Sequence, residues 1–448
     1  MSASHTSVAS FNQQLLQFLE SSPTAYHATG SLLAILLDAG FERLYEGDAW
    51  QLQPGKRYVL TRNDSSLIAF VYGAGNLTEQ GIRMVGAHTD SPCLKVKPRP
   101  ELLRMGYAQL GVEVYGGALL APWFDRDLSM AGKVSFRNRS GKLQHALINV
   151  KKPVVTIPSL AIHLDRGVND NRSINAQRDI VPLWLQLPEG EDKAPAFRQQ
   201  LLQQLQQEYP EVDAEEILDY EISLYDTQPP AIVGQREQFI ASARLDNLLS
   251  CFIGLQALLQ ADGSQSTLLI CTDHEEVGSA SCCGAKGPLL QNFLERLLPE
   301  NETRTRVIEQ SMMISADNAH GIHPNFPDRH DENHGPLLNR GPVIKINANQ
   351  RYASTSDGSA LFRLLCQQVD VPVQNFVART DMGCGSTIGP VIASEVGVRT
   401  LDVGVPTFAM HSIRELAGTQ DGWYLYRVMG AFYAYSGSLT SQLLGEQR

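Results

Sequence analysis

The sequence predicts an α/β fold: a mostly parallel sheet covered by helices and interrupted by a β-rich inserted domain. Three observations lead to this prediction. The chain has 448 residues, which is long for a single hydrophobic core. Apolar, strand-like runs alternate with helix-like segments in its second half, and this alternation is typical of parallel sheets. In the middle of the chain, glycine and proline instead break the sequence into short β-like runs.

The first part of the chain predicts two helices followed by strands. Within residues 8–40, apolar residues such as Phe11 and Leu15 recur at the spacing of one helical face, and a second run of this kind begins at Leu32. Strand-like sequence follows and ends with the apolar run 82–87. These strands are expected to enter the same sheet as those of the second half.

The middle of the chain predicts a separate unit. A glutamine-rich helical stretch at 197–208 follows several β-like runs. Because this region contributes few residues suited to catalysis, we place an inserted β-rich domain at 96–240, between the two parts of a discontinuous catalytic domain at 1–95 and 241–448. The predicted strands of the insertion lie at 110–120, 133–136, 145–149 and 153–157.

The second half returns to alternation between helices and strands. Apolar runs of strand length are separated by longer segments with helical periodicity. Such alternation favours parallel strands with helices on both faces of the sheet. The predicted helices are 245–259, 289–298, 359–368 and 422–436, and the predicted strands are 267–272, 312–315, 343–346 and 400–403.

Composition narrows the class of protein and its partners. The formal net charge is −11, the pI is near 5.5, and no long basic run exists, so we expect neither nucleic-acid binding nor binding to anionic membranes. No apolar stretch reaches the length of about 18 residues that a membrane span needs. The first residues lack the features of a secretory leader, and the 7 cysteines show no C-x-x-C spacing. Reduced thiols and a cytoplasmic location are therefore expected.

Acidic and histidine residues lie at or just beyond the ends of several predicted strands. The carboxyl ends of strands in an open α/β sheet gather ligands in one crevice, so these side chains are expected to meet. Two neighbouring divalent ions need two to three protein ligands each and one bridging carboxylate, for which Asp246 is suited. Nitrogen and oxygen donors suit zinc, with manganese or cobalt as alternatives. The candidate ligands are His88, Asp246, Glu276, Asp317 and His411.

Two further carboxylates suit supporting roles in hydrolysis. Glu275, beside the candidate ligand Glu276, could take a proton from a water molecule acidified by the metals and pass it to a leaving amine. Asp90 is placed to orient the ring of His88 through its second nitrogen. Each motif alone has an ordinary explanation, such as a solvated turn or a helix cap. Only their combination at strand ends indicates a paired-metal hydrolase site.

Other catalytic motifs are absent from the sequence. No H-E-x-x-H or G-x-S-x-G motif occurs. His330 and His334 have the spacing of zinc ligands on a helix, but Pro327 and Gly335 flank them. Proline and glycine disfavour a helix there, so this segment is interpreted as a solvated loop.

At these residues the sequence resembles the M18 family of metallo-aminopeptidases, whose animal members are called aspartyl aminopeptidases. The resemblance covers nearly the whole chain, and the motifs together are highly specific. The matching blocks are GAHTDSPCLKVKP (86–98), AIHLDR (161–166), SARLDNL (242–248), TDHEEVGSAS (272–281), SADNAHGIHPN (315–325), GPVIKINANQRYAS (341–354), CGSTIGP (384–390) and AMHSIRE (409–415).

The resemblance implies how the metals are held. One ion would be bound by the residues that match His88, Asp246 and Asp317, and the other by those that match Asp246, Glu276 and His411. The resemblance also implies a catalytic α/β domain with a β-rich dimerisation or lid insertion, and assembly of dimers into a homododecamer. Peptides would be the substrates.

The resemblance further implies roles for residues outside the metal set. The match to Glu275 would be the general base, and His163 would reach a neighbouring subunit's site and help to stabilise the oxyanion. Lys345 and Tyr352 match positions that contact substrate, and a lysine within an apolar strand could pair with an acidic side chain of the substrate. Gly383 departs from the proline expected in bacterial members, so the preference for the N-terminal residue stays open.

Three functions follow as expectations. The first is a cytoplasmic aminopeptidase that removes N-terminal residues, with acidic ones as the favoured class, from short peptides. A related enzyme that hydrolyses another amide with the same two metals is the alternative. The third is a non-catalytic assembly scaffold, which the complete ligand set and Glu275 argue against.

Overall fold

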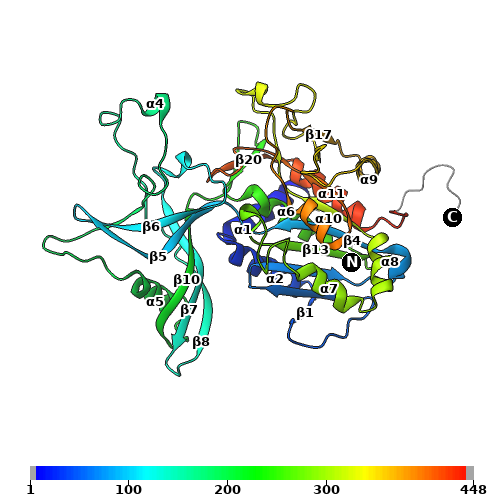
Figure 1. Ribbon diagram of the computed structural model, residues 1–448, viewed down its shortest axis with the longest axis horizontal. Helices are drawn as coiled ribbons and strands as arrows, with labels where there is room; N and C mark the ends of the chain where they lie inside the picture. The colour runs from blue at the N-terminus through cyan, green and yellow to red at the C-terminus, as the bar shows by residue number, and fades with distance from the viewer. Residues whose placement is uncertain (1–6, 440–448) are drawn as a thin grey trace. The chain divides into compact units, whose positions relative to one another are not determined.

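The computed structural model describes residues 7–439 and divides the chain into two compact units. The first unit is built from the segment up to Asp90, from Pro230–Met410 and from the segment that begins at Glu415. The second unit consists of Ser91–Pro229 and His411–Arg414. Figure 1 colours these segments along the chain. Both units are therefore discontinuous in sequence.

The first unit contains a nine-stranded sheet with strand order β1-β2-β3-β13-β4-β14-β18-β16-β17. Its central strands β13, β4, β14 and β18 are parallel neighbours, and antiparallel pairs flank them. The fold class predicted from the sequence is confirmed. The strands are β1 (Glu42–Arg43), β2 (Arg57–Arg62), β3 (Ser66–Val71), β4 (Ile82–His88), β13 (Ser266–Thr272), β14 (Met312–Ala316), β16 (Val343–Ile346), β17 (Gln374–Val377) and β18 (Arg399–Gly404).

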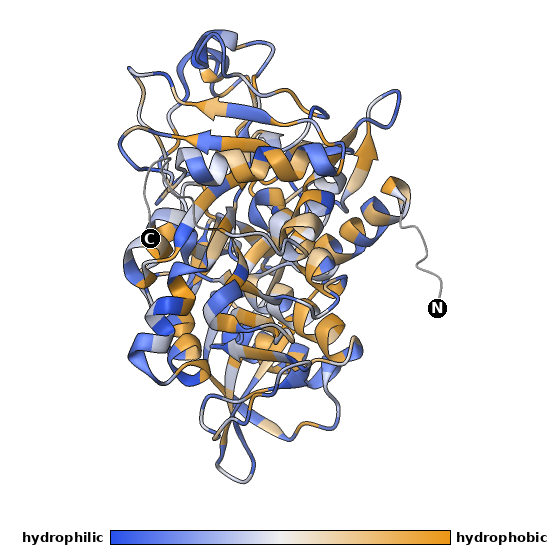
Figure 2. Ribbon diagram, turned by 90° about the vertical axis from the view of Figure 1, so that its right-hand side faces the viewer, coloured by the Kyte–Doolittle hydropathy of each residue, from blue (hydrophilic) through white to orange (hydrophobic). Residues whose placement is uncertain are grey.

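Helices cover both faces of this sheet, as predicted. Side chains alternate along β4, so that Val85 packs in the core formed with α1, α2, α6, α9 and α11, and Met84 in the core formed with α7, α8 and α10. Figure 2 shows helices with hydrophobic residues on one side and hydrophilic residues on the other. The helices are α1 (Val8–Ser21), α2 (Ala25–Asp38), α3 (Leu77–Gln80), α6 (Leu245–Leu259), α7 (Leu289–Leu297), α8 (Asn301–Glu309), α9 (Ser356–Gln368), α10 (Ile388–Val396) and α11 (Asp421–Tyr433).

A smaller five-stranded sheet, with order β11-β12-β20-β19-β15, completes the first unit. It joins distant parts of the chain, because β12, which precedes β13, pairs with β20, which follows β18. Its strands are β11 (Ala231–Val233), β12 (Phe239–Ser242), β15 (Ala319–His320), β19 (Pro406–Phe408) and β20 (Glu415–Gly418).

The second unit is built on a six-stranded antiparallel sheet with order β8-β7-β10-β5-β6-β9. Its core includes Phe197 and Leu201 of the glutamine-rich helix and Ile413 of the short returning segment. The elements are β5 (Cys93–Arg104), β6 (Tyr107–Tyr115), β7 (Leu128–Asn138), β8 (Leu143–Asn149), α4 (Val168–Asn171), β9 (Leu183–Gln186), α5 (Phe197–Glu208) and β10 (Ala214–Asp226).

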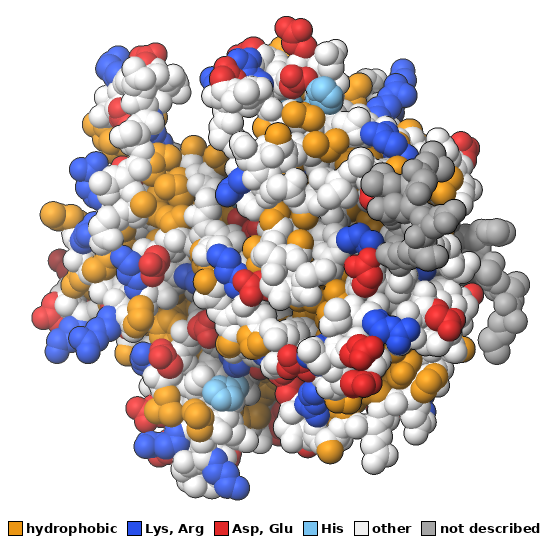
Figure 3. Space-filling model, turned by 45° about the vertical axis from the view of Figure 1, so that its right-hand side comes forward, with side chains coloured by type: hydrophobic (Ala, Val, Ile, Leu, Met, Phe, Trp, Pro, Cys, Tyr) orange, Lys and Arg blue, Asp and Glu red, His pale blue; other side chains and the backbone are white. Residues whose placement is uncertain are grey.

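The described surface carries charges of both signs. Acidic and basic side chains are interspersed on the face drawn in Figure 3. Within residues 7–439, no helix combines the length and the apolar character that a passage through a lipid bilayer requires.

Candidate metal centre

His88 is the last residue of β4, a central strand of the sheet, and its side chain is almost completely buried. Its Nδ1 lies 3.0 Å from the backbone carbonyl oxygen of Asp90, and this contact fixes the direction of the ring. Nε2 then faces three carboxylates: it lies 3.4 Å from Asp246 Oδ1, 3.6 Å from Asp317 Oδ1 and 4.0 Å from Glu275 Oε2. The strand end thus gathers acidic groups from separate segments, as the sequence predicts.

These carboxylates determine the charge at the strand end. Burial acts to lower the pKa of His88, but Asp246, Asp317 and Asp90 outweigh it and raise the pKa well above its usual value. The carboxylates therefore favour positive charge at this strand end. One donor atom each from His88, Asp246 and Glu276 lies within 4.8 Å of the others. Nitrogen and oxygen donors at this spacing fit zinc.

Asp246 owes its position to an irregular start of α6. Its backbone dihedral angles are not helical, and its backbone N–H donates to Glu415 Oε2 at 2.9 Å. The neighbouring Asn247 donates through Nδ2 to the carbonyl oxygen of Ala316 at 2.8 Å, at the end of β14. Sequence reasoning missed both Glu415 and Asn247 as positioning residues. The only sequence signal for them is that each lies beside a predicted ligand or inside a matching block.

Glu275 and Glu276 lie in a 3-10 turn, Glu275–Val277, directly after β13. His274 precedes the turn in a left-handed conformation, with φ of 61°. The carboxylate of Asp90 accepts hydrogen bonds from the backbone N–H groups of Glu275 and Glu276, each at 3.1 Å. Asp90 therefore supports this turn with its side chain. It also contacts the ring of His88, because both its carbonyl oxygen and its carboxylate oxygen Oδ1, at 3.4 Å, lie near Nδ1.

The surroundings of Glu275 favour its protonated form. Burial raises its pKa to about 7, with Asp317, Asp90 and Asp246 acting in the same direction and His88 against them. Three carboxylates thus lie close enough to raise the pKa of a fourth, that of Glu275. A cation among them would relieve their mutual repulsion.

Lys345 is buried in β16 and pairs with the metal-ligand candidate Asp317. Its Nζ donates to Asp317 Oδ2 at 3.2 Å and to the carbonyl oxygen of Asn318 at 3.1 Å. The same Nζ lies 5.1 Å from the ring centroid of Tyr352, whose side chain is also buried. A lysine within an apolar strand is explained in this way, because its charge is compensated inside the protein.

Two predicted site residues belong to the second unit. His411 has a left-handed backbone, with φ of 66°, and its Nδ1 lies 3.2 Å from the carbonyl oxygen of Gly117. His163 is exposed on a loop between β8 and α4, beside the exposed apolar residues Ile162 and Leu164. The first unit by itself brings together His88, Asp90, Asp246, Glu275, Glu276, Asp317, Lys345 and Tyr352.

Comparisons with known proteins relate this chain to one family. Residues 18–433 match the family model described as aminopeptidase I zinc metalloprotease (M18). A Pseudomonas aeruginosa protein named "Probable M18 family aminopeptidase 2" is 60% identical over 428 residues, which cover 96% of this chain and 99% of that protein. A protein of the same name from Azotobacter vinelandii is 58% identical and covers 94% of this chain and 98% of its own length.

Solved structures agree with this assignment. The chain is similar to one in "Cryo-EM structure of the Ape4 and Nbr1 complex", with a TM-score of 0.92, 37% identity, and coverage of 95% of this chain and 86% of that one. "Structure of S. cerevesiae mApe1 dodecamer" matches with a TM-score of 0.80 and 28% identity over 94% of this chain and 96% of that one. The sequence motifs, the strand-end site and these matches agree, and the chain therefore belongs to the M18 family of zinc metallo-aminopeptidases, which hydrolyse peptide bonds.

Proposed function

We propose that this protein is a two-metal aminopeptidase that removes N-terminal residues from short peptides. The observation that carries the proposal is the group of carboxylates around His88 Nε2 at a parallel strand end. His88 and Asp317 would hold one ion, Glu276 and His411 the other, and Asp246 would bridge them. When bound, such ions polarise a carbonyl group and acidify a water molecule.

Glu275 is the proposed general base. Its Oε2 lies 4.0 Å from His88 Nε2, so its carboxylate faces the ligand group, and its backbone is held by Asp90. It would take a proton from the attacking water and deliver it to the nitrogen of the leaving peptide. Hydrolysis then consumes one water molecule and yields a free amino acid and a shortened peptide.

The test of this role uses Glu275→Gln. Turnover should fall by about 10²- to 10⁴-fold, because proton transfer is lost, while the zinc content of the protein stays unchanged. Glu276→Gln is the matched control, because it should lower both activity and zinc content. Near-normal turnover of metal-loaded Glu275→Gln would rule out the assignment of the base.

An acidic N-terminal residue is the proposed preference. Lys345 supplies a buried cation beside Tyr352, but it already pairs with Asp317, so a substrate carboxylate would have to share that charge. Initial rates on Asp, Glu, Leu and Lys substrates test the preference, and Lys345→Met should lower the ratio of Asp to Leu turnover. An unchanged ratio would remove Lys345 from the specificity pocket. Cleavage of an N-acetylated substrate in place of free-amine substrates would instead support the related amide hydrolase.

Assembly into a dodecamer is proposed from the similarity to the solved mApe1 dodecamer. The second unit would serve as a dimerisation or lid domain, and the exposed apolar loop around His163 would meet a neighbouring subunit. His163 would then act at the oxyanion of that neighbour's substrate. A cytoplasmic location is also proposed, since the 7 cysteines are all free thiols.

A further inference from the structure

A second group of ligand-type side chains lies at the end of β13 and on the loop that follows it. Asp273, His274 and Cys283 each offer one donor atom within 4.8 Å of the others. Nδ1 of His274 lies 3.5 Å from Cys283 Sγ, and Nε2 lies 3.6 Å from Asp273 Oδ2. None of these three residues belongs to the candidate metal centre. The mechanism proposed above leaves them without a role.

The backbone already holds the two ends of this loop together. The N–H of Asp273 donates to the carbonyl oxygen of Cys283 at 3.2 Å and to Ser66 Oγ at 2.9 Å. The hydroxyl of Ser66 in turn donates to the same carbonyl oxygen of Cys283 at 2.7 Å. The left-handed backbone of His274 directs its ring between the two ends. The three donor atoms are therefore brought together by the fold itself.

Burial and charge suit a divalent cation. Cys283 is 1% exposed and Asp273 is 4% exposed, whereas the side chain of His274 is 24% exposed and leaves a route for an ion. On binding, the thiol and the carboxyl group would release their protons and supply two negative charges, which a divalent ion would balance. Buried charges are costly unless they are paired or coordinate a metal.

We propose that Asp273, His274 and Cys283 form an additional binding site for zinc or a similar borderline-soft divalent ion. Sulfur, nitrogen and oxygen donors are the mixture that zinc accepts in four-coordinate sites, and three protein ligands leave the fourth position to water. The ion would tie Asp273 to Cys283 across the loop that contains Glu275 and Glu276. The site does not depend on the activity proposed above.

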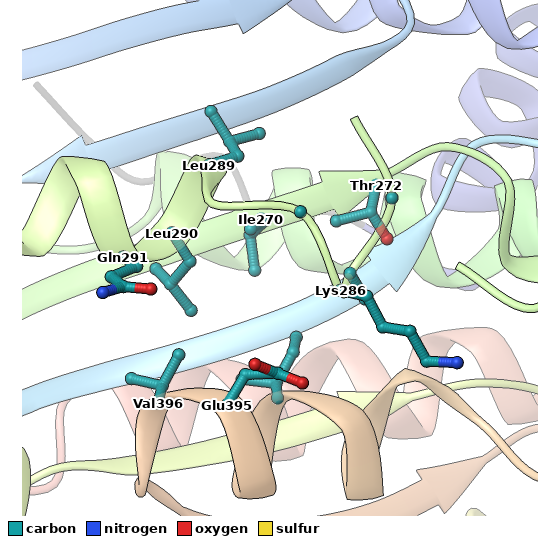
Figure 4. Close-up of a pocket in the computed structure, with 12 residues that line it drawn as sticks. Ile270, Thr272, Lys286, Leu289, Leu290, Gln291, Glu395 and Val396 are labelled. Carbon is teal, nitrogen blue, oxygen red and sulfur yellow. The ribbon is translucent and has the colours of Figure 1, made fainter. Parts of the chain in front are cut away.

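The rest of the loop has a different environment. Residues 284–287 line a pocket together with Leu289 of α7 and Ile392 of α10, and Figure 4 shows Lys286 beside Thr272 at the end of β13. Neither His274 nor Cys283 is among the residues that line this pocket. The exposed Cys282 is next to Cys283 in the chain but is absent from the ligand group. It therefore provides a matched control thiol.

Cobalt-loaded full-length protein tests the proposal. The wild type should show sulfur-to-cobalt charge-transfer absorption and should bind one cation per subunit more than Cys283→Ser, which should lack the absorption. Cys282→Ser should keep both. Asp246→Asn should lose ions of the candidate metal centre but retain the absorption, so failure of the proposed function would not affect this result. His274→Gln provides a second variant in case Cys283→Ser does not fold.

Two results would contradict the proposed site. If saturating cobalt produces no charge-transfer absorption in the wild type, the three side chains form only a hydrogen-bonded thiol–imidazole pair and the proposal is wrong. If the absorption and the cation count persist in folded Cys283→Ser and His274→Gln, another thiol binds the metal and the assigned site is wrong.

Discussion

At His88, one imidazole meets carboxylates that come from separate segments of the chain. Asp246 lies in the irregular first turn of α6, Glu275 follows β13, and Asp317 follows β14, yet their oxygens lie within 4.0 Å of the same nitrogen. Negative charges gathered around one atom repel each other, and burial increases the repulsion. Lys345 compensates part of this charge through Asp317. A cation that binds among these carboxylates should therefore stabilise the folded protein.

Lys345→Met should reveal this linkage. In metal-stripped protein, the variant leaves the buried Asp317 carboxylate without its cation, and we expect the free energy of unfolding to fall by about 3–5 kcal/mol. In zinc-loaded protein the loss should be smaller, because the ion compensates Asp317. Denaturant unfolding of both forms measures the difference, with the exposed Lys286→Met as control. Equal losses in the two forms would contradict the linkage.

His27 should make the protein sensitive to acid. Burial, aided by Arg244, lowers the pKa of His27 from 6.5 to about 4. In the unfolded chain, His27 therefore takes up a proton near pH 6.5. In the folded protein, His27 stays neutral down to about pH 4. Stability is lost as the pH falls through this window. His27→Gln should show a smaller fall in melting temperature between pH 6.5 and 4.

The exposed His145 supplies the control for this acid sensitivity. It lies in β8 of the second unit, where its Nδ1 is 2.9 Å from Ser135 Oγ. His145→Gln should leave the acid dependence of the wild type unchanged. The role of His27 would be rejected if its variant melted with the same pH dependence as the wild type.

At the scale of elements, the turn after β13 depends on Asp90. The carboxylate of Asp90 accepts the N–H groups of both Glu275 and Glu276, and so fixes the direction of the two side chains. Asp90→Asn replaces one acceptor oxygen with an N–H donor. We expect turnover to fall by about 10- to 100-fold, as is typical when a residue that supports metal ligands is changed.

A surface aspartate with a similar local bond is the control for Asp90. Asp262 Oδ1 accepts the backbone N–H of Ser264 at 2.8 Å, but it is exposed. Asp262→Asn should retain wild-type turnover. Steady-state kinetics at saturating zinc compare the two variants, and equal turnover of Asp90→Asn and wild type would show that the turn holds without this carboxylate.

The elements near the site were predictable because their periodicity is strong. Strands β4, β13 and β14 agree with the predicted runs to within one residue at each end, since they are short and mainly apolar segments. The short helices α8 and α10 were not predicted: α8 is mostly polar, and glycine and proline occur in the first turn of α10. No pattern in the sequence indicated that α6 begins irregularly at Asp246.

The site was predictable in its residue types and only partly in its contacts. Ligand candidates could be chosen because they follow strands that end at one sheet edge. The pairing of Lys345 with Asp317 and the support of Asp246 by Glu415 join residues far apart in the sequence, and no local pattern indicates such contacts. The cluster of Asp273, His274 and Cys283 was missed because it depends on how the loop closes.

At the scale of the whole molecule, the proposed assembly predicts a sensitive loop. Leu164 is 74% exposed and lies next to His163, and the neighbouring Leu160 and Ile162 are exposed as well. A group of exposed apolar side chains is typical of an interface. Leu164→Asp should shift the protein to smaller species and lower its turnover, because His163 would no longer reach a neighbour. Light scattering and initial rates measure both effects. Retention of the wild-type mass by Leu164→Asp would contradict the proposal.

Met105 is the control at this scale. It is 95% exposed in the turn between β5 and β6, away in sequence from the His163 loop. Met105→Asp introduces the same charge at an apolar surface position. We expect it to keep the mass and turnover of the wild type, so that a loss shared by both variants would indicate a general effect of surface charge.

The strand order β3-β13-β4 bears on how the chain folds during its synthesis. Leu269 of β13 pairs with both Ala69 and Val85, so β3 and β4 leave the ribosome long before the strand that lies between them. The second unit is complete except for His411–Arg414 once Pro229 has been made. Domains tend to fold as units while translation proceeds. The second unit can thus fold on the ribosome. The nine-stranded sheet of the first unit cannot be completed until β13 has been made.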